Sequence, residues 1–137
     1  VHMEKESLMY NISRIYRKLQ FCLENKMKEY DLDKGLYIYL SHLLLQGEMN
    51  QQELAKAVNR DKAPTARAVQ RLILMGYIEK IISEEDKRSN KLYITPKAEN
   101  IKQTLLQTMQ SCEDDVLIEF SLEERQTFIC LCQKFNK

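Results

Sequence analysis

The feature that most constrains the fold is a helix start that is followed almost at once by a second one. Asn50 stands three residues before Glu53, the spacing of a capping box, in which the asparagine accepts a bond from a helix amide and the glutamate bonds back to the cap amide. We expect a helix from Asn50 to about Val58, and Asp61 offers the next N-cap. Two helices joined by so short a turn form a helix-turn-helix, whose second helix can lie in a DNA major groove.

The second helix is expected to end at Gly76, which supplies the left-handed residue of a helix C-terminus. Its apolar spacing predicts that Ala66, Val69, Leu72 and Ile73 face the core. The residues expected on the opposite side are candidates for DNA contact: Lys62, Pro64, Thr65, Arg67, Gln70 and Arg71. Chemistry divides these residues, since Thr65 and Arg67 can read bases in the groove, whereas Lys62 and Arg71 are expected to contact phosphates.

A hairpin is expected directly after this helix. Tyr77–Ser83 is rich in β-branched and aromatic residues, and Leu92–Thr95 alternates apolar with polar residues, so both predict strands. The residues 83–90 between them are all polar. A hairpin with a charged tip after a recognition helix is a winged helix.

Taken together, these motifs resemble the MarR family of bacterial winged helix-turn-helix regulators. The resemblance rests on the run 61–72, on Gly76-Tyr-Ile-Glu-Lys80, on Asp86-Lys-Arg88 in the wing and on Ile94-Thr95 before a long helix. It implies that Lys87 and Arg88 contact DNA from the wing and that Asp86 orients Arg88. The chain departs from the family pattern at a few positions, with Ala63, Pro64 and Ala66 where hydroxyl residues are frequent, Ile94 for leucine, and acidic Glu84 and Glu85 in the wing. These departures bear on the target sequence more than on the fold.

The segments on either side of the winged helix also have helical patterns. A first helix is expected over about 7–28, with two adjoining apolar stripes, and a second begins near Asp33 as N-cap and runs to Gly47. After the wing, Thr95 and Pro96 open a long helix, and Ser121 with Glu124 forms a capping box for a last one. The excess apolar surface of the first and last helices favours a subunit interface over a simple core. The resemblance likewise implies an intertwined homodimer.

Length and charge bound the remaining possibilities. The 137 residues suit one domain, taken as 4–137, with the winged helix-turn-helix at about 33–95 and dimerisation helices at about 7–28 and 96–136. No apolar run is long enough for a membrane span, residues 1–3 resemble a tag remnant, and a cytoplasmic location is expected. The net charge is only +1, but 50–71 carries five basic and two acidic residues, whereas 113–125 carries six acidic and one basic. The basic part coincides with the candidate reading head.

The sequence contains few features that would indicate a catalytic site or a metal-binding site. The sequence has no Gly-rich phosphate loop and no metal-ligand cluster, and His42 has no partner at ligand spacing. The four cysteines are interpreted mainly as buried thiols, and Cys130 and Cys132 should point to nearly opposite helix faces. A redox-sensing role of Cys22, known among MarR relatives for a cysteine of the first helix, stays open as the minor alternative. We expect no enzyme, no cofactor and no metal.

The sequence therefore predicts a mainly α protein with a β-hairpin wing that binds a pseudo-palindromic promoter site as a homodimer. Control by a small-molecule effector is expected from the resemblance. Repression is the expected mode of regulation, but the residues do not distinguish it from activation. The main alternative is a winged helix that contacts proteins and not DNA. The operator sequence, the effector and the regulated genes cannot be read from the residues.

Overall fold

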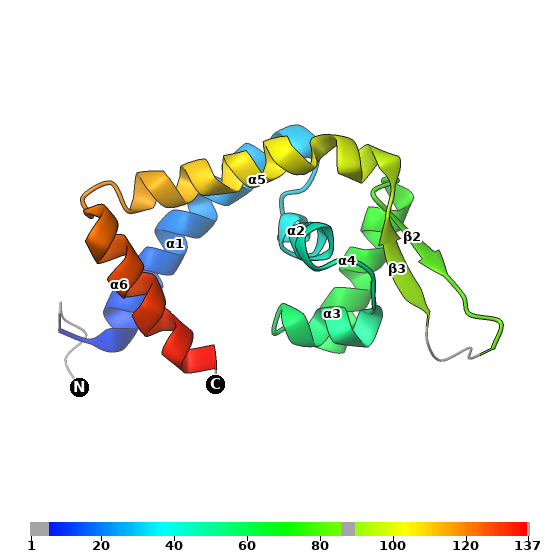
Figure 1. Cartoon of the computed structure of the whole chain (residues 1–137), viewed down its shortest axis with the longest axis horizontal. Coiled ribbons are helices and arrows are strands. Elements are labelled where there is room, and N and C mark those ends of the chain that lie inside the picture. The colour runs from blue at the N-terminus through cyan, green and yellow to red at the C-terminus, as the bar shows by residue number, and fades with distance from the viewer. Residues whose placement is uncertain (1–5, 86–89, 137) are drawn as a thin grey trace. The chain divides into compact units, whose positions relative to one another are not determined.

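The computed structural model describes residues 6–85 and 90–136 (Figure 1). Its elements in chain order are α1 (Leu8–Met27), a 3₁₀ turn (Lys28–Tyr30), α2 (Leu36–Gln46), β1 (Met49–Asn50), α3 (Gln51–Ala57), α4 (Lys62–Leu74), β2 (Ile78–Ile81), β3 (Lys91–Ile94), α5 (Pro96–Val116), α6 (Leu122–Gln133) and a last 3₁₀ turn (Lys134–Asn136). The mainly helical winged-helix fold predicted from the sequence is confirmed.

The chain divides into two compact units. The first, here called the reading unit, is the continuous stretch 24–108, which contains α2 to α4, the strands, the end of α1 and the start of α5. The second, here called the terminal unit, combines 1–23 with 109–137, so that it joins most of α1 to the end of α5 and to α6. The helices α1 and α5 therefore each contribute to both units.

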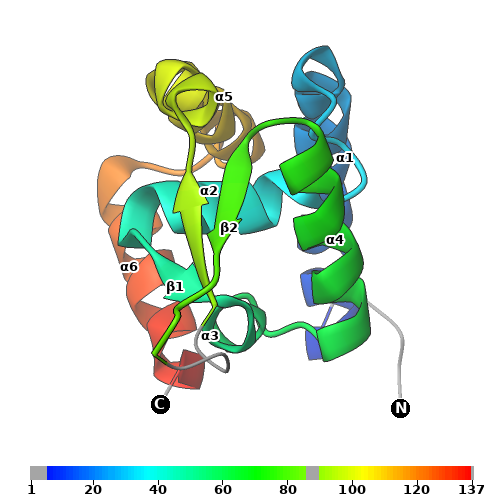
Figure 2. The same cartoon turned by 90° about the vertical axis from the view of Figure 1, so that its right-hand side faces the viewer.

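The wing belongs to a sheet of three antiparallel strands in the order β1-β3-β2 (Figure 2). In its register Met49 pairs with Leu92, and Ile78 pairs with Ile94. The two-residue strand β1 is an addition to the predicted hairpin, because so short a strand leaves no alternation to detect in the sequence. It ties the start of α3 to the wing, since Asn50 is both the last residue of β1 and the N-cap of α3.

The reading unit has a continuous apolar core. Its largest fully buried side chains come from all five helices of the unit, from β2 and β3, and from the α1–α2 connection: Met27, Leu32, Leu40, Leu43, Leu54, Val69, Leu72, Ile78, Leu92 and Leu105. The helix α2 packs against α3, α4 and β3 and forms the scaffold on which the helix-turn-helix rests. The predicted apolar stripe of α2 is buried as expected, namely Leu36, Leu40, Leu43 and Leu44.

The predicted N-cap of α2 is wrong by two residues, because Gly35 occupies that position. Asp33 is not its N-cap, because Lys34 and Gly35 adopt left-handed backbone angles, with φ of 59° and 80°, and the helix begins only at Leu36. The amides of Lys34 and Gly35 both donate to the carboxylate of Glu24 near the end of α1, the second at 2.9 Å. A long-range acceptor therefore replaces the local cap that the sequence suggested.

The terminal unit buries very little by itself. Among its described apolar residues only Leu23 and Cys112 are buried. Large side chains exposed in this unit are Leu8, Met9, Ile12, Tyr16, Phe21, Ile118, Phe120, Leu122, Ile129, Leu131 and Phe135. In the part of the chain that the structure describes, no helix has both the length and the apolar character needed to cross a lipid bilayer.

Candidate nucleic-acid interface

The first helix of the helix-turn-helix, α3, is held by local bonds at both of its ends. Asn50 Oδ1 accepts from the Glu53 amide at 2.8 Å, which gives the asparagine half of the predicted capping box. At the other end of α3, Asn59 adopts a left-handed φ of 54°, and the Asn59 and Arg60 amides donate to Lys56 and Ala55 carbonyls at 3.1 and 3.0 Å. This is a Schellman ending with asparagine in the position usually taken by glycine.

The start of α4 differs from the prediction in one bond. Asp61 occupies the N-cap position, but its side chain makes no capping bond. Its carbonyl accepts both from the Thr65 amide at 3.2 Å and from Thr65 Oγ1 at 2.8 Å. Because the hydroxyl is satisfied in this way, Thr65 can be completely buried.

The burial of Thr65 corrects the predicted orientation of α4. The buried side chains of this helix are Thr65, Ala68, Val69 and Leu72, whereas Ala66 is exposed and Ile73 is half-buried. The expectations that Thr65 faces the groove and that Ala66 faces the core are therefore wrong. Three alanines within 63–68 give almost no contrast in hydrophobicity, so the periodicity left the rotation of the helix uncertain by about one residue position.

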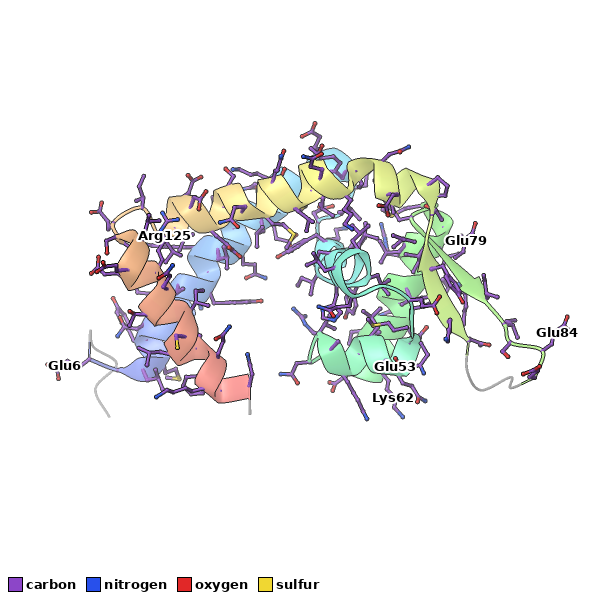
Figure 3. The ribbon with its side chains drawn as sticks, viewed as in Figure 1. Glu6, Glu53, Lys62, Glu79, Glu84 and Arg125 are labelled. Atoms are coloured by element: carbon purple, nitrogen blue, oxygen red, sulfur yellow. The ribbon has the colours of Figure 1, made fainter. Side chains whose placement is uncertain are left out.

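The remaining candidates on α4 stand at its surface. Lys62, Arg67, Gln70 and Arg71 are exposed, and Pro64 is half-buried. Lys62 marks the beginning of the helix and points away from the reading unit (Figure 3). The exposed side of α4 thus consists of these four polar residues together with Ala63 and Ala66, and it ends at Leu74.

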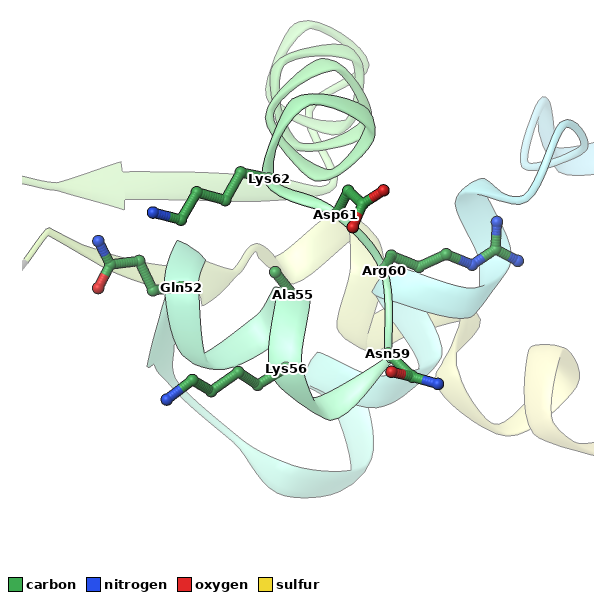
Figure 4. Close-up of a pocket in the computed structure, with 7 residues that line it drawn as sticks. All are labelled: Gln52, Ala55, Lys56, Asn59, Arg60, Asp61 and Lys62. Carbon is green, nitrogen blue, oxygen red and sulfur yellow. The ribbon is translucent and has the colours of Figure 1, made fainter.

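A cleft of about 430 Å³ lies across the helix-turn-helix (Figure 4). It is lined by Gln52, Ala55, Lys56, Asn59, Arg60, Asp61 and Lys62, so its lining includes three cationic side chains and one carboxylate. The side chains of Gln52, Lys56 and Lys62 extend to one side of α3 in this view. Such a cluster of long basic side chains fits a phosphate backbone.

A second cavity of about 310 Å³ lies between the start of α2 and the flank of α4. Its lining combines Lys34, Arg60, Arg67 and Arg71 with Gly35, Leu36, Tyr39, Pro64 and Ala68. Four cations and no acid line this cavity, so its electrostatic potential favours an anion.

The connection from α4 to the sheet is fixed at Gly76. With φ of 80° this residue ends α4 in a Schellman motif, and the Tyr77 amide donates to Leu72 O at 3.0 Å. The Tyr77 hydroxyl donates to Tyr30 O at 3.0 Å, and Lys97 Nζ lies 4.4 Å from the Tyr77 ring centroid. Burial, reinforced by nearby Asp31, raises the pKa of Tyr77, so the phenol keeps its proton and its role as donor.

The candidates in the wing tip, Asp86, Lys87 and Arg88, lie outside the described residues. The histidine and the cysteines of the described residues do not form a metal site. His42 is half-buried, and among the described residues no three His, Cys, Asp or Glu side chains gather in a way that could hold a metal. None of the four cysteines forms a disulfide. Cys112 is buried and Cys22 half-buried, but the expected burial is wrong for Cys130 and Cys132, which are exposed on α6.

Comparison with known proteins extends this picture. The model of the MarR family matches residues 36–89. The HTH-type transcriptional regulator BilQ of Clostridium symbiosum is 32% identical over 117 residues, which cover 85% of this chain and 81% of that protein. The chain therefore belongs to the MarR family. It is a DNA-binding transcriptional regulator of the winged helix-turn-helix type and not an enzyme.

Solved structures of MarR proteins agree with this assignment. A MarR protein from Peptoclostridium difficile superimposes with a TM-score of 0.87 at 26% identity, covering 99% of this chain and 92% of that one. A MarR family regulator from Listeria monocytogenes, solved in complex with a 26mer DNA, gives a TM-score of 0.88 at 22% identity over 96% of this chain and 87% of that one. At this level of identity, the second comparison shows a shared fold.

Proposed function

We propose that this MarR-family protein binds a pseudo-palindromic promoter site as a homodimer and represses transcription. The observation that carries the proposal is the exposed face of α4, where Lys62, Arg67, Gln70 and Arg71 stand clear of a core formed by the other side of the helix. A helix with one buried and one polar, basic face suits insertion into a major groove.

The side chains take different roles in this proposal. Arg67 pairs with a guanine edge, while Lys62 and Arg71 contact phosphates and set the position of the helix. The basic cleft across α3 adds Lys56 and Arg60 to the phosphate contacts. Lys87 and Arg88 of the wing, the latter oriented by Asp86, enter the adjacent minor groove.

The homodimer is supported by the terminal unit. A unit with only two buried apolar side chains among its described residues cannot be stable alone, and its exposed apolar residues need a partner. A second copy supplies a matching apolar surface through two-fold symmetry. Two recognition helices related in this way require half-sites whose centres lie about 10 base pairs apart.

Repression follows from occupancy, because a dimer that fills two successive major grooves excludes other proteins from the promoter. An effector can relieve it only if the effector binds one arrangement of the dimer better than the other. The cavity of about 310 Å³ beside α4 supports such control, since a small anion there would share Arg67 and Arg71 with DNA.

The test is selection of bound fragments from a random DNA pool by the full-length protein, followed by affinity measurements across a salt series. We expect one enriched motif with two inverted half-sites, and an affinity that falls steeply with salt. Salt-dependent binding without an enriched motif would contradict sequence-specific regulation. If the protein binds no DNA, the alternative from the sequence analysis would hold, namely a winged helix that contacts proteins and not DNA.

A further inference from the structure

The corrected orientation of α4 places an almost apolar strip on its groove-facing side. Ala63, Ala66, Gln70 and Leu74 follow one another at three or four residues and are all exposed, Leu74 to 80%. Lys62 and Arg67 flank this strip. Three of its four members carry only methyl or methylene groups, which is unusual for a surface that contacts a polar groove.

The small size of the Ala63 and Ala66 side chains matters as much as their lack of polar groups. Methyl side chains in the first two turns let the helix backbone approach the base edges closely, at the end of the helix that contacts bases in helix-turn-helix proteins. They offer neither a hydrogen-bond donor nor an acceptor. The only apolar group that a base pair presents in the major groove is the C5-methyl of thymine.

Gln70 is the polar member of the strip. Its side-chain amide can both donate and accept, and it matches the N6 and N7 edge of adenine in two parallel hydrogen bonds. An adenine and a thymine are complementary, so the preferences of the alanines and of Gln70 can be met by neighbouring A·T pairs.

We propose that the strip Ala63–Ala66–Gln70 specifies the operator half-site by reading thymine methyl groups and one adenine. The half-site is then a short A·T block beside the guanine that Arg67 contacts. This inference rests on the proposed DNA binding and adds the base sequence that the recognition helix prefers.

The test replaces thymines of the selected motif, one at a time, by deoxyuridine, which removes only the C5-methyl group. At a thymine facing Ala66 the wild-type protein should lose affinity about fourfold, the value of one buried methylene-sized group. In the Ala66→Ser variant the same replacement should have almost no effect, because the methyl contact is already gone. Ala57→Ser, at an exposed alanine of α3, is the matched control and should respond to deoxyuridine as the wild type does.

Gln70 is tested in parallel with 7-deazaadenine, which lacks the N7 acceptor. The wild type should lose at least about fivefold in affinity at one adenine per half-site, and Gln70→Ala should be insensitive at that position. A motif that is enriched but insensitive to both base analogues would overturn the inference while DNA binding stands. If no motif is enriched, the proposed sequence-specific function itself fails.

Discussion

Arg67 and Arg71 lie one helical turn apart on α4, but we expect them to affect DNA binding differently. Arg67→Ala should narrow the affinity gap between the selected motif and scrambled DNA by about 1 to 3 kcal/mol, because it removes a contact to a guanine edge. Arg71→Ala should lower the affinity for both DNAs by the same factor. It should also reduce the slope of log affinity against log salt concentration by about one. Fluorescence anisotropy on both DNAs across the salt series measures these quantities. Equal losses on both DNAs for Arg67→Ala would place Arg67 among the phosphate contacts.

Arg88 gives the second prediction at this scale. Arg88→Ala should weaken DNA binding strongly, because a planar guanidinium is suited to a narrow minor groove. Thermal stability should change little, since a surface ion pair with Asp86 contributes only about 0 to 1 kcal/mol. Lys91→Ala is the control: it removes a basic side chain that pairs with Glu48 at 3.4 Å on the sheet. Unchanged DNA affinity in Arg88→Ala would reduce the Asp86 and Arg88 motif to a structural ion pair.

Single residues also show how far the sequence could predict this site. The three basic residues of α4, namely Lys62, Arg67 and Arg71, could be recognised from charge and spacing, and they are exposed, as is Gln70. The side on which Thr65 lies could not be predicted, because its burial depends on a bond to the Asp61 carbonyl that forms only within the helix. A threonine four residues after a helix start, followed by Ala68-Val69 and Leu72, is the signal that could have indicated it.

At the scale of the element, Glu24 is the residue on which the α1–α2 connection depends. Glu24→Ala should lower the free energy of unfolding by about 1 to 3 kcal/mol, because the amides of Lys34 and Gly35 lose a charged acceptor. Glu24→Gln, which keeps one acceptor oxygen, should recover part of this loss. Urea denaturation measures the effect, and Glu29→Ala, an exposed acid of the same region, serves as control. A Glu24→Ala protein as stable as the control would show that water replaces the carboxylate without cost.

The corner between α5 and α6 gives a prediction about acid. Bonds from the Ser121 amide and hydroxyl lower the pKa of Glu124, and bonds from Gln110 and Arg125 lower the pKa of Asp114. A lowered pKa in the folded state means that the stabilisation is complete above the ordinary values of 4.5 and 3.8 and is lost as the pH falls below them.

Glu124→Gln tests how much the Glu124 charge contributes to stability, because the glutamine side chain does not titrate. We expect the wild type to be more stable than Glu124→Gln at pH 7 and the difference to shrink between about pH 5 and pH 3. Urea denaturation of both proteins at several pH values measures the difference, with Glu123→Gln as a control outside the capping box. A difference that is constant with pH would mean that the Glu124 charge does not contribute.

The elements themselves were predictable to different degrees. Caps and left-handed glycines are local signals, and they located α3, α4 and the start of α6 to within a residue or two. The start of α2 and the strand β1 depend on partners distant in sequence, namely Glu24 and Leu92, and no local pattern encodes them.

At the scale of the whole molecule, the chain should be a dimer in solution. Sedimentation velocity of the full-length protein at micromolar concentration should give twice the chain mass of 16.3 kDa. Deletion of residues 121–137 should yield an aggregated or unfolded product, because it removes α6 from the proposed dimer interface and leaves the exposed apolar side chains of α1 without a partner. A folded, monodisperse monomer of the full chain would contradict the dimer and, with it, the two-fold operator.

The two units also differ in which parts of the sequence form them. The reading unit is one uninterrupted stretch that is complete at Thr108, whereas the terminal unit needs both ends of the chain. Synthesis proceeds from the N-terminus at about 5 to 20 residues per second, and units fold as they are completed. The reading unit can thus fold while α6 is still being translated, and α1 must wait with its apolar side chains uncovered. The apolar surface proposed to pair two copies combines α1 with α6, so it is complete only after the whole reading unit has been synthesised.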